Sequence, residues 1–442
     1  MSSPAQAPAL APKLQTKLSI PFPDDARSGG LSIVGILAHA EPLGALYSPS
    51  TAAPAPIPAP AAAAAVPAPV AGPGDDDVLK AEAEKAANDA VLDPAVTLAS
   101  ASSSSAERGG DLPLGAPPRP EPKPLALILH GVLAHKDQIY HKKLVAALEM
   151  DSFRFDFRAN HETPGEWNMA SFYEDLRDLR CVISHLRRFF NYRVHVMIAH
   201  SRGALDLWVY LGEQERNRRR RRALEAQALR GPGSEVAGGI EGVLEEEVPP
   251  FAISLSGRWR MERIYDRLPV WKEGFEKEGF YRWKARVAGK DIEVHVTPQA
   301  VEDFARFPIA DYVRDAPVSS DILLIQGTAD QIVPTADIGY YMNAVGSQAG
   351  RTPGSVQMHL IDDADHNFVG HFDEVVTTIV NWLKSRQHVS QSSKTSSFSS
   401  SSSLASASSR AETAASSSVG VDSSGTGLIP SRATATAGAG KL

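Results

Sequence analysis

Apolar runs and helical patterns alternate through the middle of the chain. Six short runs of apolar, often β-branched residues predict strands. They are Leu125–Leu129, Phe153–Phe157, Val194–Ile198, Phe251–Leu255, Ile322–Ile325 and Val356–Ile361. Apolar residues recur at intervals of three and four from Phe172 to Leu186, and again from Val376 to Leu383, which predicts amphipathic helices. We therefore expect an α/β fold, with a mostly parallel central sheet covered by helices on both faces.

Two further strand-like runs lie near the N-terminus. Leu18–Pro21 and Leu31–His39 flank a turn-rich segment, so residues 17–47 are predicted to form a β-hairpin. If this hairpin pairs with the main sheet, residues 48–119 are a disordered insertion inside the domain. The alternative is that everything before Glu121 is a disordered tail. We favour the insertion because a long surface loop adds little closure entropy.

Composition shows that the 442 residues overstate the folded part. Residues 51–72 are almost wholly Ala and Pro, and Ser dominates residues 389–424. Such segments cannot bury enough apolar surface to fold, and we expect disorder in them as well as in residues 1–16 and 388–442. The remainder, roughly 260 residues, has the size of one large α/β domain. We place this domain at residues 120–387.

An Arg-rich segment interrupts that domain at residues 213–249. It holds six arginines between Arg216 and Arg222, and an acidic run at Glu245–Glu247. A basic cluster can bind nucleic acid or act as a nuclear address. We favour a solvated helix extension whose charges balance the acidic run, since the formal net charge of −7 argues against a nucleic-acid binder.

The remaining composition favours a cytoplasmic protein. Cys181 is the only cysteine, so no internal disulfide can form and a reducing compartment is expected. The N-terminus lacks the pattern of a secretion signal, and no apolar run is long enough for a membrane span. The C-terminal Gly440–Leu442 is a near miss to the peroxisomal Ser-Lys-Leu address, which leaves the peroxisome as a weaker alternative.

A serine lies where one predicted strand ends. The run Val194–Ile198 stops at Ala199–Gly203, and a helix-compatible pattern follows at once. Small residues two before and two after the serine let the backbone turn sharply and expose the hydroxyl. The segment Ala26–Gly30 has the same spacing, but it lacks both the preceding strand and the following helix. We therefore predict Ser201 as a nucleophile, provided that a base lies beside it.

Two further polar residues follow strand ends. Asp330 lies after Ile322–Ile325, and His366 lies after Val356–Ile361. Taken singly, the aspartate could simply cap a helix and the histidine could be a surface residue. The chain order of Ser201, Asp330 and His366, however, is the triad order of α/β-hydrolases and differs from that of other serine hydrolases.

Two backbone amides are expected to complete the site. Val132 follows the first parallel strand, where its N–H group can point at a developing oxyanion. Arg202 begins the helix behind Ser201, where the helix dipole also favours negative charge.

With these residues in place, the chain resembles the α/β-hydrolase superfamily. It looks closest to the cinnamoyl-esterase-like, monoacylglycerol-lipase-like and serine-aminopeptidase-type members. The likeness covers Leu18–His39 and about Pro124–Arg386, without the Arg-rich segment. Phe155–Thr163 resembles the family's Asp-Phe-Arg-Gly-x-Gly-Glu-Ser loop, Gly165–Trp167 continues it, and Ile253–Arg258 adds support at a strand end. The resemblance implies Ser201 as nucleophile, Asp330 as orienting acid and His366 as base, with Val132 and Arg202 as the amide donors.

The chain departs from the family pattern at three positions. Ala199 replaces the usual elbow glycine, and Ala159 and His161 replace two glycines of the loop. His161 could crowd the mouth of the pocket or contact a substrate group. We take His130, His161 and Trp259 as candidate pocket residues.

Residues 258–315 are expected to form a helical cap over the site. Seven aromatic residues lie within it: Trp259, Tyr265, Trp271, Phe275, Phe280, Tyr281 and Trp283. Ordinary packing of cap helices explains most of them, and an aromatic-lined cap also suits an acyl or aryl ester.

The sequence therefore predicts a serine hydrolase that cleaves small carboxylic esters. A peptidase or thioesterase with the same triad is the nearest alternative, and a non-catalytic hydrolase-fold interaction protein is another. No cofactor is implied, and the 13 histidines show no zinc-binding spacing. The sequence leaves the oligomeric state open.

Overall fold

A computed structural model of the protein describes residues 10–22, 31–41, 121–228 and 248–399. The expected disordered segment 48–119 lies outside the described residues, as do residues 1–9, 229–247 and 400–442. The chain divides into a compact unit, Met1–Ser385, and a second unit, Arg386–Leu442. In the second unit, the structure describes only the end of the last helix.

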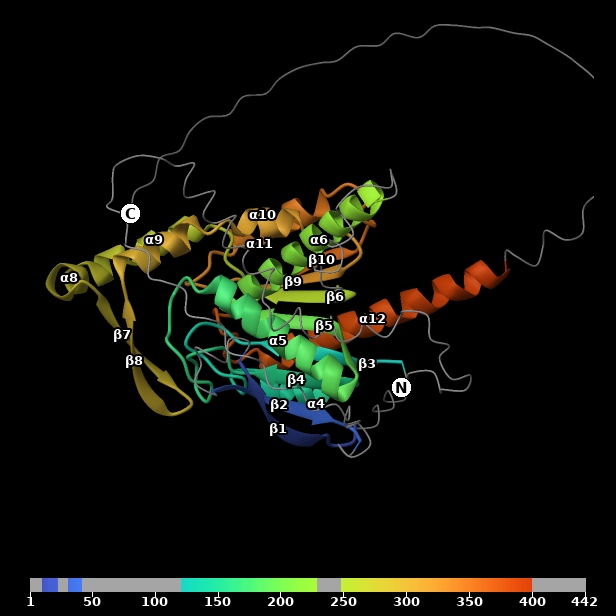
Figure 1. Cartoon of the computed structure of the whole chain (residues 1–442), viewed down its shortest axis with the longest axis horizontal. Coiled ribbons are helices and arrows are strands. Elements are labelled where there is room, and N and C mark those ends of the chain that lie inside the picture. The colour runs from blue at the N-terminus through green and yellow to red at the C-terminus, as the bar shows by residue number, and fades with distance from the viewer. Residues whose placement is uncertain (1–9, 23–30, 42–120, 229–247, 400–442) are drawn as a thin grey trace, which may run out of the picture. The chain divides into compact units, whose positions relative to one another are not determined.

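An eight-stranded sheet forms the centre of the first unit (Figure 1). Its strands are β1 (Leu14–Pro21), β2 (Ser32–His39), β3 (Lys123–Leu129), β4 (Asp151–Phe155), β5 (Tyr192–His200), β6 (Phe251–Leu255), β9 (Asp321–Gly327) and β10 (Val356–Ile361). They are ordered β1-β2-β4-β3-β5-β6-β9-β10. The six strands from β4 to β10 in this order pair in parallel, whereas β1 and β2 are antiparallel additions.

Alternate strand residues bury their side chains on opposite faces of the sheet. In β3, Leu125, Leu127 and Leu129 pack into one apolar cluster, and Ala126 and Ile128 pack into another. The first cluster takes in α5 (Phe172–Phe190), α6 (Arg202–Ala228), α10 (Ile309–Arg314) and α11 (Ala336–Gly346). The second takes in α4 (His141–Ala147) and α12 (Phe372–Ser399). The expected fold class, a mostly parallel sheet with helices on both faces, is therefore confirmed.

The N-terminal strands join the main sheet. β1 and β2 pair along their whole length, and β2 pairs with β4 from Gly35 to Ala38. Gly35 is required by this contact, because a Cβ atom there would lie 2.1 Å from the Phe153 ring. β1 begins at Leu14, before the start expected at residue 17, and α12 continues through Ser399, beyond the boundary expected at residue 387.

One predicted strand is displaced by two residues. We expected it at Phe153–Phe157, whereas β4 ends at Phe155. The residues that follow bond to the loop after β3: Asp156 accepts the Lys136 backbone N–H at 2.7 Å, and Phe157 N–H donates to His130 Nε2 at 2.9 Å. These bonds fix the loop on which Val132 lies.

The segment between β6 and β9 includes residues 258–315, where we expect the cap. It contains the 3-10 helix η2 (Met261–Arg267), α8 (Leu268–Glu278), the antiparallel hairpin β7 (Tyr281–Val287) and β8 (Lys290–Val296), and α9 (Pro298–Arg306). The hairpin was not predicted. It projects beside α8 and α9 at the left of Figure 1.

The described part of the Arg-rich segment continues α6. Arg216 and Arg219 form ion pairs with Asp315, at 2.8 and 2.7 Å, and Arg218 lies 3.6 Å from Glu215. The positive charge of these arginines is thus balanced by acidic residues of α6 itself and of the segment after α10. The run Glu245–Glu247 lies outside the described residues.

Among the described residues, no helix combines the length and the apolar character that a membrane crossing requires.

Candidate active site

Ser201 occupies the turn between β5 and α6. Its backbone φ is 56°, in the left-handed region, and its N–H group donates to the Leu255 carbonyl at 2.8 Å. Gly203 permits the turn, because a Cβ atom there would lie 2.5 Å from the His130 carbonyl oxygen. Ala199 is buried in β5, so the alanine fits where the family pattern has glycine. The strand and helix therefore hold Ser201 at the carboxyl edge of the sheet.

The structure brings Ser201, His366 and Asp330 together. His366 Nε2 lies 2.9 Å from Ser201 Oγ, and His366 Nδ1 lies 2.8 Å from Asp330 Oδ2. The carboxylate can only accept, so Nδ1 carries the proton and Nε2 is free to accept from the serine hydroxyl. The three residues come from the loops after β9 and β10 and the turn after β5, which end at one edge of the sheet.

Four N–H groups surround the Asp330 carboxylate. Oδ1 accepts from the backbone amides of Ile332 and Val333, each at 2.8 Å. Oδ2 accepts from Gln326 Nε2 at 2.7 Å as well as from His366. Burial by itself raises the pKa of Asp330, but the hydrogen bond from His366 and those from the amides outweigh it, so the pKa is lowered. Asp330 is therefore an anion that holds one imidazole tautomer.

His200 fixes the backbone of the histidine loop. Its Nε2–H donates to the His366 carbonyl at 2.8 Å, and Ser256 Oγ donates to the same oxygen at 3.3 Å. Burial lowers the pKa of His200 to about 3, so this imidazole is neutral. Sequence reasoning missed both residues. The one available signal was that each lies at a strand end, His200 next to Ser201 and Ser256 next to β6.

The two expected amide donors, Val132 and Arg202, both lie on the wall of the cavity that contains Ser201 and His366. Arg202 is the first residue of α6, and the first four N–H groups of a helix have no partner within it. Its side chain is anchored on α5 by Asp175 Oδ2 at 2.6 Å, and it also bonds Ser171 Oγ and the Met169 carbonyl. These contacts fix the position of the Arg202 amide.

The cavity at the serine has a volume of about 370 Å³, within the usual range for small-molecule sites. Much of its apolar wall comes from α6, the segment before α5, and the cap, with further apolar residues from the loops after β3 and β9: Val132, Ala134, Met169, Leu205, Ile264, Val270, Trp271, Tyr281, Trp283, Phe304, Ile332 and Val333. Polar groups line the remainder: Gln138, Ser256, Arg258, Arg267 and Asn367. The site therefore offers an apolar pocket next to a serine–histidine pair.

The three candidate pocket residues lie elsewhere. None of His130, His161 and Trp259 is among the residues that line this cavity. His130 is buried, donates from Nδ1 to the Gly131 carbonyl at 2.7 Å and accepts at Nε2, and burial lowers its pKa to about 4. Trp259 stacks on Tyr340 at a centroid distance of 6.0 Å.

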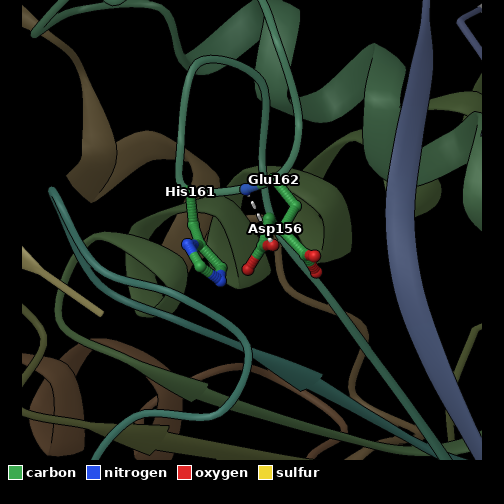
Figure 2. Close-up of side chains that lie close together, drawn as sticks. All are labelled: Asp156, His161 and Glu162. Atoms are coloured by element: carbon green, nitrogen blue, oxygen red, sulfur yellow. Dashed lines mark hydrogen bonds between the residues drawn. The ribbon is translucent and has the colours of Figure 1, made fainter. Parts of the chain in front are cut away.

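His161 lies in an acidic cluster with Asp156 and Glu162, shown in Figure 2. Ligand atoms of the three residues lie within 4.8 Å of one another, close enough to hold a metal ion. However, the buried ammonium group of Lys136 bonds both carboxylates, and Lys17 bonds Glu162 at 2.6 Å. Hydrogen bonds from Lys136 and Lys17 lower the pKa of Glu162 to about 2. The cluster therefore fits a lysine and not a metal ion.

Three features together identify the fold: the order of the strands in the sheet, the turn after β5 that holds Ser201, and the loop after β3 that contains Val132. The fold is that of the α/β-hydrolases. No family model matches the sequence. An uncharacterized Saccharomyces cerevisiae protein, YDL057W, is 22% identical over 261 residues, which cover 56% of this chain and 69% of the yeast protein.

Solved structures of three hydrolases are also similar to this chain. Est1E of Butyrivibrio proteoclasticus, solved with ferulic acid, is 14% identical with a TM-score of 0.40, over 60% of this chain and 90% of that one. The Pyrococcus furiosus esterase Pf2001 is 12% identical with a TM-score of 0.41, over 84% and 92%. A Paleococcus ferrophilus monoacylglycerol lipase is 14% identical with a TM-score of 0.38, over 60% and 96%.

Proposed function

We propose that this α/β-hydrolase is a serine esterase that cleaves small carboxylic esters through an acyl-enzyme intermediate. The observation that carries the proposal is the chain of contacts from Ser201 Oγ through His366 to Asp330, at 2.9 and 2.8 Å. Ser201 and His366, the proposed nucleophile and base, line the cavity within hydrogen-bond reach of each other, and Asp330, the proposed orienting acid, bonds the imidazole from outside this lining. A hydrolase-fold protein that only binds partners would not need this set.

In the proposed reaction, Ser201 Oγ attacks the ester carbonyl while His366 Nε2 accepts the hydroxyl proton. The carbonyl oxygen becomes an oxyanion, which the backbone N–H groups of Val132 and Arg202 stabilise. His366 then gives the proton to the leaving alcohol, and an acyl-Ser201 ester remains. Water attacks that ester with His366 again as base, which releases the acid and restores the serine.

Asp330 keeps the imidazole in one tautomer throughout this cycle and stabilises the imidazolium that forms at each step. The carbonyl contacts of His200 and Ser256 hold the backbone of His366 while its ring exchanges the proton. With a single cysteine, Cys181, the protein suits a reducing compartment such as the cytoplasm.

Replacement of the serine tests the proposal. Ser201→Ala should abolish hydrolysis of short 4-nitrophenyl esters and labelling by a fluorophosphonate probe, because both need the same oxygen. Ser319→Ala, at an exposed serine before β9, is the matched control and should keep both. Retention of either activity by Ser201→Ala would refute the assignment. Thioester and amino-acid amide substrates, assayed alongside, separate an esterase from a thioesterase or peptidase.

A further inference from the structure

The wall of the cavity is unbalanced in charge. Arg202, Arg258 and Arg267 line it, and its described lining residues include no Asp or Glu. Arg202 does not contribute a free positive charge, because Asp175 neutralises it at 2.6 Å. The other two guanidinium groups therefore set the charge of the cavity.

Arg258 makes no ion pair with a carboxylate of the described residues. It comes three residues after β6, within the segment that resembles the family at this strand end, and its Nη2 donates to the Ile332 carbonyl at 2.8 Å. Ile332 in turn donates its own N–H to Asp330. The guanidinium group is thereby held on the side of the cavity next to the triad acid.

The acidic residues nearest to Arg258 are already engaged by other groups. Asp337 bonds Arg260 at 2.7 Å, and Asp330 bonds His366 at 2.8 Å. Asp266 pairs with Arg263 at 2.6 Å. Burial, together with the like charge of Arg267, lowers the pKa of Arg258. A guanidinium group stays charged at neutral pH all the same. An anion in the cavity would supply the partner that the protein does not.

Arg267 approaches the cavity from the cap. It is the last residue of η2 and is exposed to solvent, so it lies at the open part of the wall. An exposed and a partly buried arginine on one wall match an anionic group that enters from solvent, since arginine binds carboxylates and phosphates through two parallel hydrogen bonds.

We propose that the preferred substrate is an ester that also carries an anionic group, a carboxylate or a phosphate. Arg258 binds this group, Arg267 assists it at the cavity mouth, and the apolar part of the substrate packs against Trp271, Tyr281 and Trp283. The inference rests on the proposed esterase function for its reaction. It concerns Arg258 and Arg267, however, which take no part in bond cleavage.

A matched pair of esters tests the proposal. 4-Nitrophenyl hydrogen glutarate and 4-nitrophenyl valerate have acyl chains of the same length and differ by one terminal carboxylate. The full-length protein should have a kcat/KM at least about 10-fold higher for the glutarate ester at low salt, from one charge-assisted contact. This preference should shrink in 0.5 M NaCl, because salt screens exposed charges.

Arginine variants locate the effect. Arg258→Gln should lower the ratio of the two kcat/KM values by about 10- to 100-fold, and Arg258→Lys should restore part of it. Arg267→Gln should lower the ratio less. Arg286→Gln is the matched control, because Arg286 lies on β7, pairs with Asp291 rather than with an acid near Arg258, and does not line the cavity. It should leave the ratio unchanged. Equal rates for the two esters, or equal losses for both in Arg258→Gln, would overturn the proposal.

Binding to Ser201→Ala separates this proposal from that of the esterase. Glutarate and inorganic phosphate should each quench the fluorescence of the cavity tryptophans, and Arg258→Gln should weaken that binding about 10-fold or more. If phosphate binds more tightly than glutarate, the anionic group of the substrate is a phosphate. If glutarate binds more tightly than phosphate, the anionic group is a carboxylate. If neither ester is cleaved but the anions bind through Arg258, the esterase proposal fails and the anion site stands. If neither anion binds at 10 mM, the anion site is refuted whatever the esterase activity.

Discussion

Asp330→Asn is the sharpest test of the proposed site, because it changes one oxygen of the proposed triad acid into an NH₂ group. In the native protein, four N–H groups converge on this carboxylate. An asparagine side chain has one oxygen and one NH₂ group, so it can accept from only one of the two pairs. The outcome depends on which pair keeps its acceptor.

The fixed backbone amides are expected to keep the oxygen. Ile332 and Val333 cannot turn their N–H groups away, whereas the other two donors can adapt. Gln326 can rotate its amide, at the loss of its 3.2 Å bond to the Val333 carbonyl. His366 can move its proton from Nδ1 to Nε2. The NH₂ group of the asparagine would then donate to Nδ1, and Nε2 would no longer be a base for Ser201.

The expected loss in kcat is large compared with the loss in stability. A wrong tautomer of the triad histidine lowers kcat by about 10⁴-fold. One or two poorly satisfied buried donors reduce the free energy of unfolding by about 1–3 kcal/mol each, which should leave the variant folded at 25 °C. Hydrolysis of 4-nitrophenyl acetate measures kcat, and urea unfolding measures stability. Asp362→Asn, at an exposed position on the histidine loop, is the control.

A folded Asp330→Asn variant that keeps more than about a tenth of the native kcat would refute the reasoning, given the size of the tautomer effect. The oxygen would then face His366, or another group would orient the imidazole.

Two further predictions concern stability. Burial first, and the nearby Asp175 second, raise the pKa of Asp206, whose carboxylate oxygens have no hydrogen-bond partner among the described residues. A raised folded-state pKa gives stability that is lost as pH rises above the unfolded value of about 3.9. The free energy of unfolding of Asp206→Asn, measured in urea, should therefore rise relative to that of the native protein by up to about 1.4 kcal/mol per pH unit between pH 4 and pH 7. A difference between the two proteins that stays constant with pH would contradict this. Ala159 and His161 have φ values of 58° and 46°. Glycine adopts positive φ without strain, so glycine at either position should stabilise the protein by about 0.5–1 kcal/mol. The control, Ala305→Gly in α9, should destabilise the protein by a similar amount. Loss of stability in both loop variants would show that side-chain contacts outweigh the backbone strain.

The parts of the fold that follow local rules could be predicted from the sequence. β6 and β10 match the predicted strands residue for residue, because each is a short, mostly apolar run that ends at polar turn residues. The positions of Ser201, Asp330 and His366 could be inferred from strand ends, because parallel strands bring their carboxyl ends to one edge. Their roles stay predictions until the variants are measured.

Contacts between distant side chains could not be predicted. Lys136 and Asp156 are 20 residues apart, and nothing in either segment marks them as partners. The hairpin β7–β8, by contrast, has a signal that the sequence analysis missed: apolar residues alternate with charged or polar ones along Tyr281–Val287 and Lys290–Val296, which is typical of strands. Arg258 has no carboxylate partner among the described residues because the described acids around it bond other groups, and a linear pattern does not contain that information.

His200 and Arg202, the two residues that flank Ser201, hold other parts of the site in position. A motif of small residues around a serine does not indicate this. His200 bonds the backbone of His366, so the residue before Ser201 positions the proposed base. Arg202 bonds Asp175 on α5, so the residue after Ser201 is held where its amide is proposed to bind the oxyanion. The His200 contact acts on the backbone of His366, whereas the Arg202 contact joins two side chains and holds the first residue of α6 against α5. On the proposed mechanism, a change at either flanking residue would therefore displace His366 or the Arg202 amide relative to Ser201.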